Sequence, residues 1–285
     1  MLQRIHAVKR RIENGAATAA SITATLLVIA PLIAIFAYLV MQGIGAINWD
    51  FLTQAPKPVG EIGGGMGNAL VGSVVILLMA SAIGIPLGVG AGVYLAEYGK
   101  GSFSTLVRFV ADVLNGVPSI VMGIAVYTLI VLRQKHFSAF AGGVALGIMM
   151  VPTISRATEE MLLMVPRSVR EAAYGLGAPE WRTILSITLR TALPGVITGI
   201  MLAFARVAGE TAPLLFTAFG NQFWNWNVNQ PTAALPLQIY TYAISPYEDW
   251  HRQAWAGALV LIALIVGTVL LVRITANRGV MKGNA

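Results

Sequence analysis

The chain contains no cysteine and few charged side chains. Of its 285 residues, 11% are charged and 56% are hydrophobic, whereas a soluble globular protein has about 25% charged residues. The lack of cysteine excludes disulfides, thiol chemistry and cysteine-ligated metals. His6, His136 and His251 are far apart in the sequence and lack the spacing of a metal site. This composition indicates a protein that lies mostly in lipid.

The sequence also lacks a nucleotide-binding motif of the form G-x-x-x-x-G-K-[ST]. Gly99-Lys100 is followed by another glycine, and the glycine-rich run at 63–67 does not follow a strand. Within the apolar segments there is no His/Asp/Glu metal spacing and no Ser/His pair, which argues against an intramembrane enzyme. We therefore expect a non-catalytic protein that has no cofactor of its own and does not hydrolyse ATP.

Six apolar segments approach the length of about 20 residues that a helix needs to cross the hydrocarbon core. They are residues 19–40, 69–95, 109–132, 138–154, 191–219 and 254–272. The first is expected to be a retained helix, because its apolar core is too long for a signal peptide and no clear cleavage site follows it. The predicted fold is an all-α polytopic membrane protein with six transmembrane helices.

Lysine and arginine are concentrated on one side of this predicted bundle. They fall mainly in the tail 1–18, the loop 156–190 and the tail 274–285. The opposite side has Lys57, Arg133, Lys135 and Arg252. Because basic loops remain in the cytoplasm, both tails and the loop 156–190 are expected to be cytoplasmic. Residues 41–67 then form an outer loop, and residues 68–273 form a core of five helices.

The loop 156–190 carries local signals for a helix, a turn and a second helix. Val165-Pro166 is expected to end the preceding helix, and Ser168 with Glu171 fits a capping box at the start of the next one. Gly177 can end that helix with a positive φ, and Pro179 suits the first turn of another helix. A solvated loop with no special role is the simpler interpretation of these charges.

The order Glu171-Ala172-Ala173, followed by Gly177, resembles the EAA loop of ATP-binding-cassette (ABC) importers. In that family the loop is the helical element through which a membrane subunit contacts a separate ATPase. The resemblance implies that Ala172 and Ala173 keep the helix surface thin enough to fit a groove on the ATPase. It also implies that Gly177 permits the turn and that Glu171 caps the helix and offers charge to the partner.

Arg206 and Glu210 lie within the predicted fifth span, and a charged side chain at that depth needs a partner or a wet path. Their spacing of four residues would place them on one helix face, where they can pair. Gly209 and Pro213 predict a kink or break beside them. The pair is either a structural ion pair or part of an anion pathway, since a guanidinium matches two phosphate oxygens.

A longer resemblance then covers about residues 60–275. The runs Val113-Leu114-Asn115-Gly116-Val117-Pro118-Ser119 and Ala205-Arg206-Val207-Ala208-Gly209-Glu210-Thr211-Ala212-Pro213 resemble the PstA family of phosphate-importer permeases. The resemblance implies a type I ABC importer fold in a bacterial inner membrane. It implies that Arg206, Glu210 and Thr211 belong to the pathway of inorganic phosphate.

The same resemblance implies a set of partners. They are a second, PstC-like membrane subunit, two PstB-like ATPase subunits that bind the ATP, and a phosphate-binding protein on the outer face; no nucleic acid is expected. A permease for another oxyanion, such as molybdate, sulfate or a phosphonate, is the main alternative. An ion-gradient transporter is a further one, although it would have no use for an EAA loop.

Overall fold

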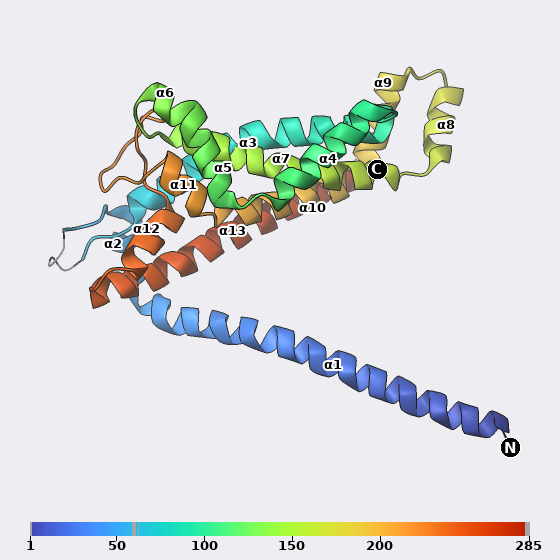
Figure 1. Ribbon diagram of the computed structural model, residues 1–285, viewed down its shortest axis with the longest axis horizontal. Coiled ribbons are helices and arrows are strands. Elements are labelled where there is room, and N and C mark those ends of the chain that lie inside the picture. Colours follow the sequence, from blue (N-terminus) through green and yellow to red (C-terminus); the bar gives the residue numbers. More distant parts are fainter. Residues whose placement is uncertain (1, 59–60, 62, 283–285) are drawn as a thin grey trace.

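The computed structural model describes residues 2–58, 61 and 63–282, and this part of the chain is helical, with no β-strand (Figure 1). Five of the described helices are long and apolar enough to cross a membrane. A bent pair of helices brings that number to six if the pair forms one span. The all-α polytopic fold predicted from the sequence is therefore confirmed, but not every span is a straight helix.

The long helices are α1 (Leu2–Gly43), α3 (Gly67–Val93), α7 (Ala139–Leu163), α10 (Leu189–Ala208) and α13 (Glu248–Lys282). The shorter ones are α2 (Trp49–Thr53), α4 (Ser102–Gly116), α5 (Ser119–Val126), α6 (Leu132–Gln134), α8 (Arg167–Gly175), α9 (Glu180–Thr183), α11 (Ala212–Thr217) and α12 (Leu235–Ala243). The π-helical turns η2 (Tyr94–Tyr98), η3 (Tyr127–Val131) and η4 (Ile184–Thr188) continue α3, α5 and α9, and the 3-10 turn η1 (Ile44–Ala46) follows α1.

Two helices continue past the ends of the predicted spans. The fourth span was expected to end at residue 154, but α7 continues to Leu163. On the other side of the loop, α9, η4 and α10 form one helix from Glu180 to Ala208. Only residues 164–179 of the predicted loop 156–190 therefore lie outside these long helices. The physical reason is that charged residues end an apolar segment without breaking the helix that carries them.

The core of the molecule is the close pair of α3 and α7. Gly84, Gly88 and Gly92 repeat every four residues along one face of α3, where α7 lies against the α3 backbone. A Cβ at Gly88 would be 2.7 Å from the Ile154 Cβ, and a Cβ at Gly92 would be 2.5 Å from the Thr158 Cβ. Small residues allow such close approach of helices in membranes, where packing rather than water drives association. Helices α10 and α4 pack against the same α7.

The third predicted span, residues 109–132, is not one straight helix. Helix α4 ends at Gly116, and the chain bends by 106° before the α5–α6 segment. The cause is local: Pro118 disfavours the helical conformation of the residue before it, and Val117 is extended, with φ −68° and ψ 130°. The two halves of this span can therefore pack against different neighbours.

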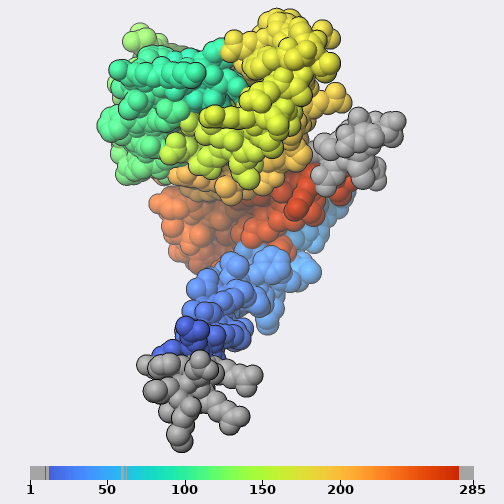
Figure 2. Space-filling model, turned by 90° about the vertical axis from the view of Figure 1, so that its right-hand side faces the viewer, coloured from blue at the N-terminus to red at the C-terminus, as the bar shows by residue number. Residues whose placement is uncertain are grey.

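Helix α1 leaves the body of the molecule and lies apart from it in both views (Figures 1 and 2). Its C-terminal end is held by α13. A Cβ at Gly43 would be 2.7 Å from the Trp255 carbonyl oxygen, and the rings of Tyr38 and Trp255 meet edge to face at 5.3 Å. The start of α1, the end of α13 and α8 all lie toward one end of the molecule, and α2 and α12 lie toward the other (Figure 1).

Candidate functional site

Helix α8 is a short, separate helix that protrudes from the end of the body (Figure 2, yellow). It begins at Arg167, directly after Pro166, as the predicted break at Val165-Pro166 requires. The predicted capping box is wrong. Pro166 is the N-cap residue, so Ser168 and Glu171 lie inside the helix. Proline has a fixed φ and no N–H, and it therefore starts the helix two residues earlier than the serine would have done.

The C-terminal end of α8 closes as predicted. Gly177 has a φ of +79°. Its N–H donates to the Tyr174 carbonyl at 2.9 Å, and the Ala178 N–H donates to the Ala173 carbonyl at 3.1 Å. These two bonds form a Schellman motif, in which glycine adopts the left-handed conformation at little cost. The motif fixes the turn between α8 and α9 and leaves Leu176 90% exposed at its tip.

Ala172 and Ala173, the two alanines of the predicted ATPase contact, point in different directions. Ala172 is exposed together with Glu171, but Ala173 is only 4% exposed. The small side chain of Ala173 allows α8 to pack against its own chain, and the role of the two alanines at an ATPase stays a prediction. The exposed face available to a partner contains Glu171, Ala172, Tyr174 and Leu176.

Behind α8 lies a cavity of about 370 Å³ between this helix and the end of the α3–η2 helix. Arg170 stands beside it and donates to the Glu97 carboxylate at 2.9 Å. Sequence reasoning missed this contact, because Glu97 and Arg170 are separated by 73 positions. The signal that could have found it is a carboxylate near the end of a long apolar helix, which requires a partner.

The second predicted site lies where α10 ends. Helix α10 stops at Ala208, Gly209 follows it, and a new helix, α11, starts at Ala212 with Pro213 in its first turn. The predicted break is thus confirmed, and the continuous span 191–219 is not. Because Pro213 has no N–H to donate to the Gly209 carbonyl, the hydrogen-bond ladder stops at this point.

The break separates Arg206 from Glu210. Arg206 is exposed on the last turn of α10, whereas Glu210 and Thr211 are half-buried in the connection to α11. Among the described residues, no ion pair joins the two side chains. The predicted pairing across one helix face is wrong, because a spacing of four residues brings side chains together only in a continuous helix. The guanidinium is left available at the helix end.

The two broken spans meet next to this point. Helix α11 packs on α5, and a Cβ at Gly123 would be 2.6 Å from the Pro213 Cα. At the other side of the α4–α5 bend, the Thr153 hydroxyl donates to the Asn115 side-chain oxygen at 3.2 Å, which ties α4 to α7. Breaks in membrane helices are tolerated where the freed backbone groups meet protein or water. Two adjacent breaks with an exposed arginine are the arrangement expected along a polar path.

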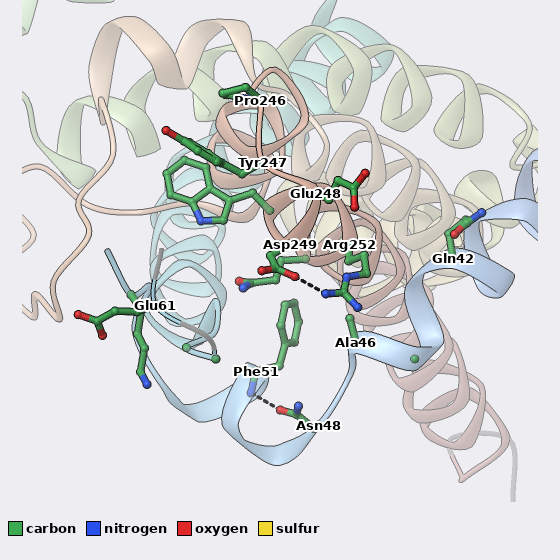
Figure 3. A pocket seen from close by; sticks show the side chains of 16 residues that line it. Gln42, Ala46, Asn48, Phe51, Glu61, Pro246, Tyr247, Glu248, Asp249 and Arg252 are labelled. Carbon is green, nitrogen blue, oxygen red and sulfur yellow. Dashed lines mark hydrogen bonds and ion pairs between the residues drawn. The ribbon is translucent and has the colours of Figure 1, made fainter. Parts of the chain in front are cut away.

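A second cavity, of about 610 Å³, lies at the opposite end of the molecule (Figure 3). Its walls come from the segment after α1, from α2 and from the start of α13. Asp249 and Arg252 form an ion pair there, and the Asn48 side chain accepts from the Phe51 N–H at 2.7 Å as the N-cap of α2. The cavity is lined by none of the predicted site residues. It is separate from the α10–α11 break beside Arg206.

Comparison with known proteins agrees with this architecture. Residues 84–278 match the family described as the binding-protein-dependent transport system inner membrane component. The chain belongs to this family. It is thus a permease of an ABC importer, a polytopic inner-membrane subunit that works with ATPase and binding-protein partners. Homologues of the chain are transport permease subunits.

The permease has relatives over almost its whole length. It is 45% identical over 266 residues to the phosphate transport system permease protein PstA of Yersinia pestis, covering 93% of this chain and 90% of that protein. It is 48% identical over 261 residues to PstA of Xylella fastidiosa (strain Temecula1 / ATCC 700964), covering 90% of each. Identity to PstA of Haemophilus influenzae is 49% over 229 residues, 80% of each chain. The resemblance to the PstA family is confirmed.

Comparison with solved structures identifies the fold independently of the sequence relatives. An inward-facing structure of the MetNI methionine ABC transporter superposes with a TM-score of 0.55 at 20% identity, covering 75% of this permease and 92% of that chain. At that identity the likeness concerns the fold alone. It confirms the type I importer fold expected from the sequence.

Proposed function

We propose that this permease is the PstA-like subunit of an ATP-driven importer of inorganic phosphate and forms half of its translocation path. The observation that carries the proposal is the identity of 45–49% to curated phosphate permeases over 80–93% of the chain. The exposed Arg206 at the α10–α11 break supports it, because the planar guanidinium donates to two oxygens of one phosphate and stays charged at all physiological pH values.

In this proposal the phosphate passes the end of α10. Arg206 binds the anion, and Glu210 and Thr211 line the connection that follows it. Glu210 accepts a proton from hydrogen phosphate or pairs with Arg206 after the anion leaves. The absence of an Arg206–Glu210 ion pair in the described residues supports the anion pathway over a purely structural pair, since the guanidinium is already available. The permease itself needs no cofactor.

Helix α8 is the coupling element of the proposal. Glu171 and Ala172, with Leu176 at the tip, form the face that contacts the ATPase, while Gly177 holds the turn and Ala173 packs inward. Two PstB-like ATPase subunits bind the ATP, a PstC-like permease supplies the other half of the path, and a phosphate-binding protein docks on the outer end. Both termini lie on the cytoplasmic side with α8, in a bacterial inner membrane.

The test is uptake of labelled phosphate into vesicles that hold this permease with its candidate partners. We expect uptake to require ATP and the binding protein and to persist in excess sulfate or molybdate. A phosphonate is added as a third competitor, which distinguishes a phosphate permease from a phosphonate permease. Uptake without ATP would reject the coupling role of α8, and uptake blocked by another oxyanion would keep the importer but change its substrate.

A further inference from the structure

Arg170 makes three hydrogen bonds, to η2 and to the C-terminal end of α7, at the base of the coupling helix. From α8 its Nη2 donates to the Glu97 carboxylate of η2 at 2.9 Å and to the Leu162 carbonyl of α7 at 2.9 Å. Its Nη1 donates to the Val165 carbonyl, just beyond α7, at 2.8 Å. The last carbonyls of a helix have no partner within it and carry partial negative charge. Arg170 therefore caps α7 and pairs with the end of the α3–η2 helix at the same time.

A second arginine, Arg108, which is half-buried, contacts the same turn. Arg108 of α4 donates to the Glu159 carboxylate of α7 at 2.7 Å and to the Leu95 carbonyl of η2 at 3.1 Å. Glu159 is 3% exposed. The π-helical turn η2 thus lies between two arginines, one on α4 and one on α8. Such wide turns interrupt the regular ladder and leave carbonyl groups for other donors, and they are frequent at functional sites.

Helix α3 and helix α7 can transmit a displacement because they are packed tightly along their length. The contacts of Gly84, Gly88 and Gly92 leave no room between the two backbones. A force applied at the ends of α3 and α7 therefore moves them together rather than sliding one along the other. Besides the Arg170 hydrogen bonds, α8 packs on its neighbours through Val169 and Ala173, and the chain at 164–166 and 176–179 joins it to the adjacent helices.

We propose that Arg170 and Glu97 are positioning residues that fasten the coupling helix to the ends of α3 and α7, so that movement of α8 reaches the membrane helices. This inference rests on the proposed coupling of α8 to an ATPase. The side chains of Arg170 and Glu97 are 16% and 10% exposed, so solvent screens their interaction far less than that of a surface pair. Removing the carboxylate would leave the arginine charge buried without its anion.

The test uses Glu97→Ala in the complete transporter in vesicles, with phosphate imported per ATP hydrolysed as the readout. We expect the ATPase subunits to remain bound, because the exposed face of α8 is unchanged, while the import ratio falls at least about tenfold, which is about 1.4 kcal/mol of coupling. Glu97→Asp, which keeps the charge, should recover most of the ratio. A role in stability alone would lower the amount of complex but not this ratio.

The matched control is Glu160→Ala. Glu160 is also a carboxylate near the cytoplasmic end of α7, but its side chain is 62% exposed and its ion pair with Arg156 is 3.8 Å long. Surface pairs of this kind contribute little, so the import ratio should stay at the unsubstituted value.

Two outcomes would overturn the inference. One is a Glu97→Ala import ratio within about twofold of the unsubstituted complex, less than 0.5 kcal/mol. Another is loss of ATPase binding in Glu97→Ala, since the pair would then serve docking. If Glu97→Ala does not accumulate, the import ratio is measured instead for Glu97→Gln, which keeps the size of the side chain. Failure of the unsubstituted complex to couple uptake to ATP would instead reject the proposed function.

Discussion

Replacing Gly88 with alanine tests whether α3 and α7 form one rigid unit. The substitution adds a single methyl group at the contact with Ile154. That methyl would lie 2.7 Å from the Ile154 Cβ and 2.8 Å from its Cγ2, whereas ordinary contact begins at 3.4 Å. The two backbones must therefore move apart by about 0.7 Å, the difference between these distances, within an interior that is close-packed.

The cost can be estimated by comparison with Gly90 of the same helix. Overpacking a tight interior by a methylene-sized group costs about 1–3 kcal/mol, and alanine in place of glycine in a helix gains about 1 kcal/mol. A Cβ at Gly90 meets no atom of the described chain within 4 Å, so Gly90→Ala carries only the second term. The difference between the two variants isolates the contact and should be about 1–3 kcal/mol.

The assay is reversible unfolding of the purified permease in mixed micelles with increasing denaturing detergent, with the unfolding free energies of both variants compared. We expect Gly90→Ala to equal or exceed the unsubstituted protein and Gly88→Ala to fall below Gly90→Ala. Equal stability of the two variants would refute the close α3–α7 packing and, with it, the route by which α8 moves the membrane helices.

Three further changes test the sites themselves. Arg206→Gln should lower phosphate uptake at least about 30-fold, since truncating a charged contact costs about 2 kcal/mol or more. The complex should remain assembled on size exclusion, and loss of assembly would favour a structural role. Gly177→Val strains a positive φ by about 1–2 kcal/mol and should weaken co-purification of the ATPase, whereas Gly175→Val should not. Equal ATPase binding by the two variants would contradict the role of the turn. Gly123→Leu should destabilise the α5–α11 contact with Pro213 by about 1–3 kcal/mol in thermal unfolding; an unchanged midpoint contradicts that packing.

Much of the coupling segment could be predicted because its signals are local. The ring of Pro166 fixes its φ angle and separates two helices. Gly177 adopts the positive φ that a Schellman motif requires. The break after α10 was also predictable from Gly209 and Pro213. Each of these features depends on the conformational limits of one residue, which the sequence carries directly.

The direction in which a side chain points was less predictable. The sequence pattern treats Ala172 and Ala173 alike, but only the packing of α8 against its own chain buries Ala173. Glu159 was assigned to a loop because charges suggested the end of a span, whereas α7 continues through it and Arg108 neutralises it from 51 positions away. A pairing over that distance depends on how two helices cross, which neither residue determines alone.

The sequence by itself determined the number and approximate place of the apolar segments, the helical class, the coupling turn and the positions where proline interrupts a helix. Only the tertiary structure decided that the third span bends by 106°, that Arg206 and Glu210 separate at the α10–α11 break, and that Arg170 reaches Glu97. Hydrophobicity and backbone limits act residue by residue along the chain. Ion pairs and close helix contacts exist only once distant segments have met.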